Sequence, residues 1–156
     1  MLGGGIDVQG LTEVAGCAGA GKTQLALRCL LHVQLPPTEG GLSGGAIYIN
    51  SEGSNAPFLR RLSALADAYA EKYRHMGATS LALLEQIITI EAVEPDMLMR
   101  ALEQIEGVTL PSRPIRLIVL DSIAAVFRSD DKPDDPYGAH GPCRRDSREP
   151  RFWRHE

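Results

Sequence analysis

The sequence predicts an α/β domain in which helices pack on a parallel β-sheet. Short β-like runs alternate with segments of helical periodicity along residues 1–128. A loop rich in Gly and Ala lies between the first run and the first helical segment, and Asp121 ends the last apolar run. Strands that alternate with helices are typical of βαβ units, whose strands run parallel.

The composition limits the class of protein. The chain has 156 residues, a net charge of −4 and 44% hydrophobic residues, which is ordinary for a globular domain with its own core. This charge gives no global basic field that would indicate a nucleic-acid-binding protein. The N-terminus lacks signal-peptide features, no apolar run reaches membrane-spanning length, and the three cysteines lack a metal-site spacing. We therefore expect a soluble, intracellular protein.

Four runs have the length and composition of strands. The last of them, RLIVLD, is apolar on both faces. The predicted strands cover residues 11–15, 46–50, 87–93 and 116–121.

Three helices are predicted between these strands. The first starts at Lys22 and continues to about Leu35, and the second, from Ala56 to Met76, has apolar residues at three- and four-residue spacings. The third, residues 95–107, begins with proline and ends with glycine, as helices often do. Residues 36–45, PPTEGGLSGG, are predicted as a loop, because Pro and Gly disfavour regular structure.

The character of the sequence changes after residue 128. Residues 129–156 contain four prolines, dense mixed charge and no periodicity, so we predict a disordered, charged, Pro-rich tail behind a core at residues 1–128. Its RRDSREPRFWR portion combines basic residues with two aromatic residues, as a nucleic-acid patch would. A solvated tail without a selected function is the stronger interpretation.

The loop after the first strand matches the phosphate-binding pattern GxxxxGK[ST] as GCAGAGKT. Residues with little or no Cβ allow successive backbone N–H groups to face a phosphate, and the helix dipole adds positive charge. A chance loop of small residues is the alternative, but the preceding strand and the following helix are the context that favours nucleotide binding. The predicted nucleotide-binding residues are Gly16, Cys17, Ala18, Gly19, Ala20, Gly21, Lys22, Thr23 and Gln24.

Two carboxylates are predicted at the carboxyl edge of the sheet. Asp121 ends strand 116–121 and, with Thr23, is a candidate Mg²⁺ ligand, although an Asp in this position is often a turn residue or a helix cap. Glu52 follows strand 46–50 and is a candidate for orienting the attacking water, with a solvated loop glutamate as the alternative. Lys22 would reach the β- and γ-phosphates.

The segments LTEVAGCAGAGKTQLAL, GGLSGGAIYINSEG, FLRRL and RLIVLDSIAAVFRSD together resemble the core of the RecA/RadA-type recombinase family over about residues 3–130. The resemblance implies a RecA-like P-loop NTPase core with ATP on Gly16–Thr23, a metal role for Asp121 and a water-activating role for Glu52. It also implies DNA repair by homologous recombination in the nucleus, with other recombinase paralogues as partners. Single-stranded or branched DNA would be bound through that complex, with no membrane partner.

The family places an arginine beside the adenine, near Arg60 and Arg61 of this sequence. The spacing from Glu52 is shifted by about one residue, so exposed arginines on a solvated helix face are the alternative interpretation of both residues.

After Phe127 and Arg128 the sequence departs from the family pattern. The family continues with a long helix, a strand ending in an Asn-Gln pair that senses the nucleotide, and loops that grip DNA. In the family, the strand after the metal aspartate inserts between the aspartate strand and the P-loop strand. The C-terminal half of a RecA-type domain is therefore expected to be missing, as in a truncated splice form or a misjoined gene product.

The first functional hypothesis is an ATP-binding recombinase paralogue whose hydrolysis is weak at best and DNA-dependent. A non-catalytic module that docks onto recombinase paralogues in a nucleotide-dependent way is the alternative, which the absent sensor strand favours. A generic RecA-like P-loop ATPase is the third hypothesis.

Overall fold

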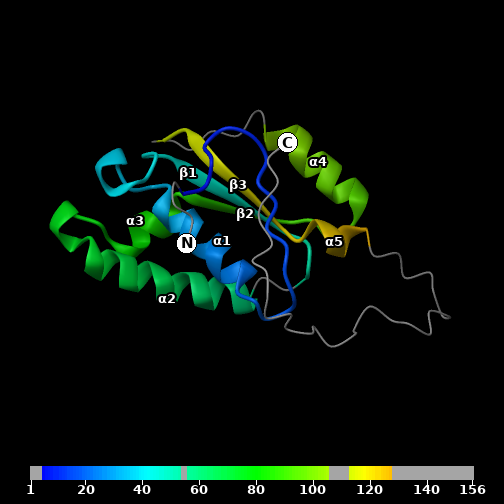
Figure 1. The fold of residues 1–156 in the computed structure, drawn as a ribbon, viewed down its shortest axis with the longest axis horizontal. Helices are drawn as coiled ribbons and strands as arrows, with labels where there is room; N and C mark the ends of the chain where they lie inside the picture. Colours follow the sequence, from blue (N-terminus) through cyan, green and yellow to red (C-terminus); the bar gives the residue numbers. More distant parts are fainter. Residues whose placement is uncertain (1–4, 54–55, 106–112, 128–156) are drawn as a thin grey trace, which may run out of the picture. The chain divides into compact units, whose positions relative to one another are not determined.

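The structure of the chain is a computed structural model, which describes residues 5–53, 56–105 and 113–127 (Figure 1). The chain divides into two compact units, Met1–Lys22 with Asp131–Glu156 and Thr23–Asp130, and each is described by itself. The predicted tail, residues 129–156, and the last two residues of the predicted helix 95–107 lie outside the described residues.

In the first unit, residues 11–15 do not form the predicted strand. Leu11 is 86% exposed, and the described sheet has three strands, none of which comes from this segment. A strand is stable only when its backbone groups pair with neighbours and its apolar side chains are covered. The prediction of a strand at 11–15 is therefore wrong for the structure as described.

The predicted helices are confirmed with small shifts at their ends. Helix α1 spans Lys22–His32, α2 spans Ala56–Lys72 and α4 spans Pro95–Ile105. Helix α2 ends before the predicted Met76 because the chain tightens into a 3₁₀ turn at Arg74–Met76, which Gly77 closes with a φ of 74°.

Shorter helical segments were not predicted. Helix α3 (Ser80–Glu85) begins after Thr79, whose side chain accepts a hydrogen bond from the Ala82 N–H at 3.2 Å. A 3₁₀ turn at Pro37–Glu39 lies within the predicted loop, and helix α5 (Ile123–Val126) follows the last strand.

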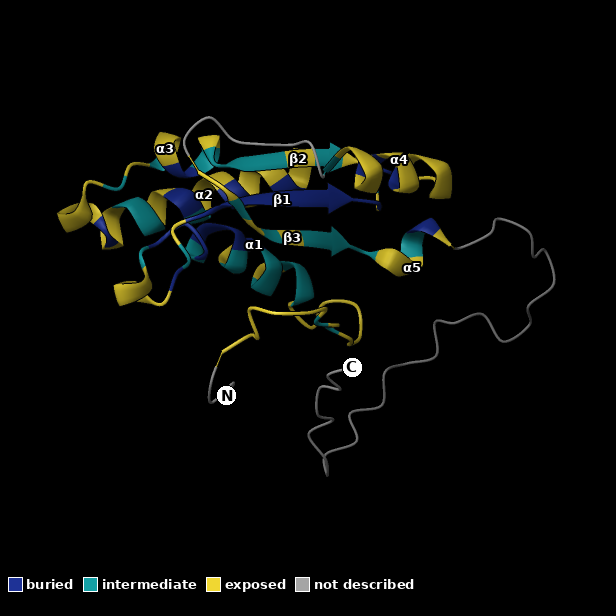
Figure 2. Cartoon of the chain, turned by 90° about the horizontal axis from the view of Figure 1, so that it is seen from above, coloured by how far each residue is buried: buried dark blue, intermediate teal, exposed yellow. Residues whose placement is uncertain are grey.

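The described sheet contains three parallel strands in the order β2-β1-β3. Strand β1 spans Gly45–Asn50, β2 spans Ile87–Glu91 and β3 spans Ile115–Asp121, so the predictions at 46–50, 87–93 and 116–121 are confirmed. All six residues of the central strand β1 are buried, whereas β2 and β3 are only partly covered (Figure 2). Asn50 is in register with both Glu91 and Asp121, so the three strands end at one edge.

Alternate residues of β1 face two hydrophobic clusters. Ala46 and Tyr48 pack with buried residues of α1, α2 and α3, while Ile47 and Ile49 pack with residues of α4 and α5. Helices therefore cover both faces of the sheet (Figure 1), as predicted for an α/β fold. Within the described ranges, no helix has both the length and the apolarity needed to cross a membrane.

Candidate nucleotide-binding site

The loop Gly16–Gly21 has a backbone that depends on its glycines. Gly19 and Gly21 have φ angles of 75° and 94°, in the left-handed region that L side chains rarely adopt. The Ala20 N–H donates to the Cys17 carbonyl at 3.1 Å, and helix α1 begins directly afterwards at Lys22. The two left-handed positions near a helix start give the alternating backbone that anion-binding loops use.

The Lys22 side chain folds back over this loop. Its ammonium group donates to the carbonyl oxygens of Gly16 at 2.8 Å and Cys17 at 3.0 Å. The loop thus carries the ammonium group of the half-buried Lys22, which would attract a phosphate. Gln24, the last residue of the predicted set, is exposed in the first turn of α1.

In the second unit, two hydroxyl groups converge on Asp121 at the end of β3. The Thr23 hydroxyl donates to Oδ2 of Asp121 at 2.7 Å, and the Tyr48 phenol donates to the same oxygen at 3.0 Å. The side chain of Asp121 therefore meets the threonine of the motif across 98 positions of sequence. Ser122, not Asp121, occupies the N-cap position of α5, so Asp121 is not a helix cap.

The Tyr48 ring is fixed within the core. Tyr48 is 2% exposed and stacks on Phe58 of α2, with ring centroids 4.0 Å apart and planes 11° apart. Burial raises the pKa of Tyr48, and the Asp121 carboxylate raises it further. The phenol therefore stays protonated at neutral pH and acts as the hydrogen-bond donor.

The donor set at Asp121 fits a hard divalent cation. Thr23 and Asp121 supply a hydroxyl and a carboxylate oxygen within 2.7 Å of each other, and oxygen ligands of these kinds suit Mg²⁺. Neither hydrogen bond uses Oδ1 of Asp121. The described residues contain no cluster of three or more His, Cys, Asp or Glu side chains, so any bound cation would complete its coordination with ligand or water oxygens.

Glu52 lies in a turn after β1, and the Asn50 side chain shapes this turn. The Asn50 amide oxygen accepts from the Glu52 N–H at 3.1 Å, and its amide nitrogen donates to the Gly53 carbonyl at 2.5 Å. Glu52 is exposed and lines an open hollow of about 500 Å³ with Ser51, Gly53, Val93 and Ala125. The carboxylate is therefore accessible to water and to a ligand.

A pair of serines joins the turn after β1 to the end of β3. The Ser51 hydroxyl accepts from the Ser122 N–H at 2.8 Å and donates to the Ser122 carbonyl, while the Ser51 N–H donates to the Asp121 carbonyl at 3.1 Å. The Ser122 hydroxyl in turn donates to Oε1 of Glu52 at 3.3 Å. Glu52 and Asp121, predicted to share one edge of the sheet, are thus linked through the backbone and side chain of Ser122.

The hydrogen-bonded polar residues at this edge of the sheet form what we call the Asp121 cluster: Thr23, Tyr48, Asn50, Ser51, Glu52, Asp121 and Ser122. Arg60 and Arg61 do not take part in it. Both are exposed on α2, two and three residues after Phe58, and no described side chain of the Asp121 cluster bonds to them. Their exposure agrees with the alternative interpretation of arginines on a solvated helix face.

Four polar residues of this cluster were not predicted. The Asn-Ser pair at the end of strand β1 is a turn signal that could have indicated Asn50 and Ser51. A serine next to a strand-ending aspartate was a weaker signal for Ser122. Tyr48 carried no signal of its own, because a tyrosine in a strand normally indicates core packing.

The fold and the loop place this chain among α/β proteins that combine a parallel sheet with a P-loop sequence motif. The chain belongs to the Rad51 family, which matches residues 1–133. This membership confirms the resemblance to the RecA/RadA-type recombinase family found in the sequence. The segments HVQLPPTEGGLSGG and IVLDSIAAVFRSD also indicate a likeness to the third X-ray-repair cross-complementing paralogue, which the XRCC3 relatives confirm.

Curated relatives agree with the family. DNA repair and recombination protein RadA of Metallosphaera sedula is 36% identical over 130 residues, which cover 83% of this chain and 37% of RadA. DNA repair protein XRCC3 of Bos taurus is 38% identical over 135 residues, and that of Mus musculus is 40% identical over 136 residues. Each XRCC3 alignment covers 83% of this chain and 38% of the relative. The chain thus spans well under half the length of these relatives.

Proposed function

We propose that this chain binds ATP with Mg²⁺ and contributes that site to DNA repair by homologous recombination. The observation that carries the proposal is the 2.7 Å hydrogen bond between Thr23, the last residue of the GxxxxGK[ST] pattern, and Asp121, the acid at the end of β3. A phosphate-binding threonine and a strand-ending aspartate are the two protein groups that P-loop enzymes use at Mg²⁺. Family membership and the names of the relatives support the role in recombination.

The loop and Lys22 would bind the phosphates. Backbone N–H groups of Gly16–Gly21 and the start of α1 favour an anion, because each contributes partial positive charge. A phosphate oxygen would replace the Gly16 and Cys17 carbonyls as the acceptor for the Lys22 ammonium. Thr23 and Asp121 would hold Mg²⁺, which neutralises charge on the phosphates when bound.

Glu52 would orient the attacking water. Its carboxylate is exposed at the carboxyl edge of the sheet and receives a hydrogen bond from Ser122. A carboxylate in this position can accept a proton from water or align it. In this proposal, catalysis depends on electrostatic positioning of groups rather than on a covalent intermediate.

The partners and the place of action are proposed from membership of the same family. We propose that the chain acts in the nucleus with other recombinase paralogues, and that single-stranded or branched DNA is bound through the complex. The net charge of −4 supports an indirect route to DNA, because the chain lacks a global basic field.

The proposal is tested by titrating a fluorescent ATP analogue with Mg²⁺ into the wild-type chain and Lys22→Ala. We expect the substitution to weaken binding by about two orders of magnitude, since it removes a charged donor to the phosphates. Lys72→Ala is the matched control, because Lys72 is an exposed lysine on α2 outside the loop. Equal affinities of wild type and Lys22→Ala would contradict the proposal.

The competing hypothesis is a docking module in which the nucleotide has only a structural role. The exposed turn that carries Glu52 would then be a docking surface whose use depends on the bound nucleotide. Glu52 would not be a catalytic group. Family membership leaves this hypothesis open, whereas it disfavours a generic RecA-like ATPase of another kind.

Turnover distinguishes the enzyme from the docking module. In the enzyme, Glu52→Gln should lower ATP hydrolysis with single-stranded DNA by about 10²-fold or more while nucleotide affinity stays unchanged. Release of labelled phosphate measures this rate, with Glu85→Gln as the control on α3. Nucleotide binding without turnover in the wild-type chain would favour the docking module.

A further inference from the structure

The geometry assigns Tyr48 a role as the positioning residue that holds Asp121 for the metal. This inference rests on the proposed Mg·ATP site and adds to it a residue that neither the loop motif nor the carboxylates indicate. Tyr48 would not touch the cation or the nucleotide. It would act through Asp121, as hydrogen-bond partners of metal-ligating carboxylates do.

The hydrogen-bond pattern at Asp121 separates the two carboxylate oxygens. Tyr48 and Thr23 both donate to Oδ2, at 3.0 and 2.7 Å, and neither of these bonds uses Oδ1. Two donors on one oxygen fix the plane of the carboxylate, so the direction of Oδ1 is also fixed. If the Thr23 hydroxyl oxygen were used to hold a cation, Tyr48 would still donate to Asp121 and keep it in place.

The phenol is itself held from two sides. Tyr48 lies on β1 in register with Val119 of β3, two residues before Asp121, so the backbone sets the reach of the ring to the carboxylate. On its face, the ring stacks on Phe58 at 4.0 Å. A buried, stacked ring has little rotational freedom, so its hydroxyl is pre-organised before any ligand arrives.

The stacking and the hydrogen bond can be separated experimentally. Tyr48→Phe keeps the ring, its burial and its contact with Phe58, and removes only the hydroxyl. Tyr73→Phe is the matched control, because Tyr73 is also buried, at 4% exposure, but lies after α2 beside Tyr69 and His75 rather than at Asp121.

The experiment compares the wild-type 156-residue chain with its Tyr48→Phe and Tyr73→Phe variants in their binding of a fluorescent ATP analogue. Affinity is measured in EDTA and along a Mg²⁺ titration, and Mn²⁺ binding with ATP is followed by electron paramagnetic resonance. We expect Tyr48→Phe to need roughly tenfold more Mg²⁺ for half of the metal effect, as typical for loss of a partner of a metal ligand. The affinity of Tyr48→Phe in EDTA should equal that of wild type. Tyr73→Phe should equal wild type both in its affinity in EDTA and in its Mg²⁺ requirement.

Three results would overturn the inference. An unchanged Mg²⁺ requirement in Tyr48→Phe, with a clear metal effect in wild type, would remove the role of Tyr48 and leave the proposed function intact. An equal loss of affinity in EDTA and in Mg²⁺ would indicate a general packing role. Absence of nucleotide binding in wild type would overturn the proposed function and the role of Tyr48 with it.

Discussion

Gly21 shows at the scale of one residue how the loop depends on backbone conformation. Its φ of 94° lies in a region where an added Cβ is strained, although a Cβ there would meet no atom within 4 Å. The requirement for glycine at this position is therefore conformational and not a matter of space.

Gly21→Ala should weaken ATP binding by about tenfold or more. A non-glycine residue held at positive φ costs about 1–3 kcal/mol, which the loop would relieve by leaving the phosphate-binding conformation. Gly77→Ala is the control, since Gly77 also has positive φ, 74°, and an unobstructed Cβ position but closes a turn after α2. Equal losses of affinity in both variants, measured by nucleotide titration, would refute a specific role for Gly21.

The positions of single residues could be predicted where a residue type and its place in a strand were sufficient, while their roles stay predictions. Asp121 and Glu52 were predicted at one edge because parallel strands end together, and the structure links them through Ser122. Tyr48 could not be predicted, because its contact with Asp121 depends on the register of β1 against β3 and on the ring of Phe58. Neither is visible in a local pattern.

At the scale of elements, Ser51 connects the ends of β1 and β3. Its hydroxyl is hydrogen-bonded to both the N–H and the carbonyl of Ser122. Beyond their last paired residues, Asn50 and Asp121, the two strands are also joined by the bond from the Ser51 N–H to the Asp121 carbonyl and by the bond from the Ser122 hydroxyl to Glu52.

Ser51→Ala should accelerate hydrogen exchange of the Ser122 amide by about two- to tenfold. The substitution removes the acceptor of that amide, and one hydrogen bond contributes about 0.5–1.5 kcal/mol net. Exchange measured by NMR checks this, with Ser63→Ala on the exposed face of α2 as the control. If the Ser122 amide exchanged at the wild-type rate in Ser51→Ala, the proposed link between the strands would be wrong.

The elements also show the limit of periodicity. The predictions of strands at 46–50, 87–93 and 116–121 are confirmed because each of these segments pairs with a neighbouring strand in the structure. Residues 11–15 were also predicted as a strand from their sequence, but none of the three described strands comes from them, so pairing rather than propensity decided the outcome. Helix α3 was missed because six residues are too few for helical periodicity to be recognised.

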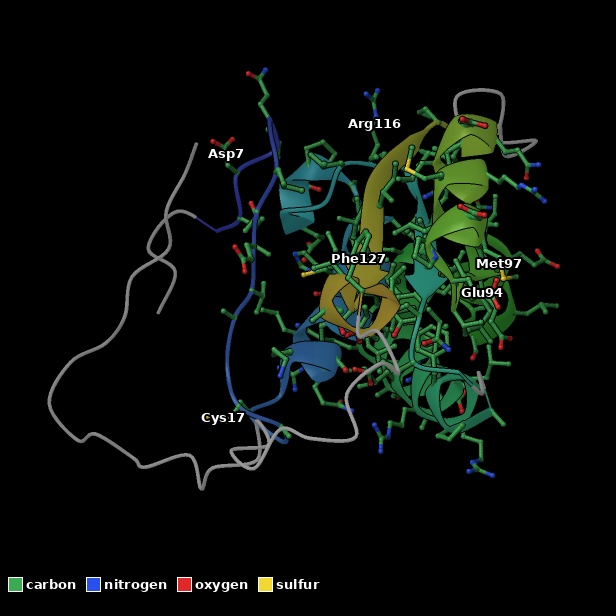
Figure 3. All side chains as sticks on the ribbon, turned by 90° about the vertical axis from the view of Figure 1, so that its right-hand side faces the viewer. Asp7, Cys17, Glu94, Met97, Arg116 and Phe127 are labelled. Carbon is green, nitrogen blue, oxygen red and sulfur yellow. The ribbon has the colours of Figure 1, made fainter. Side chains whose placement is uncertain are left out.

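For the whole molecule, β3 lies at the edge of the described sheet although its sequence is apolar on both faces. Strand β3 pairs with β1, and within the described part of the chain no strand pairs on its other side. Ile118 is 47% exposed. Phe127, which is labelled in Figure 3, follows α5 and is 64% exposed. The described part of the chain therefore leaves apolar side chains exposed beside the sheet.

The central claim is that this chain holds the phosphates of ATP, and one calorimetric titration tests it most directly. The full chain is titrated with ATP and with adenosine, each in the presence of Mg²⁺. The account predicts saturable binding of ATP and no measurable binding of adenosine, because the loop, Lys22, Thr23 and Asp121 all act on the phosphates or their metal. Absence of ATP binding, or binding of adenosine as tight as that of ATP, would contradict it.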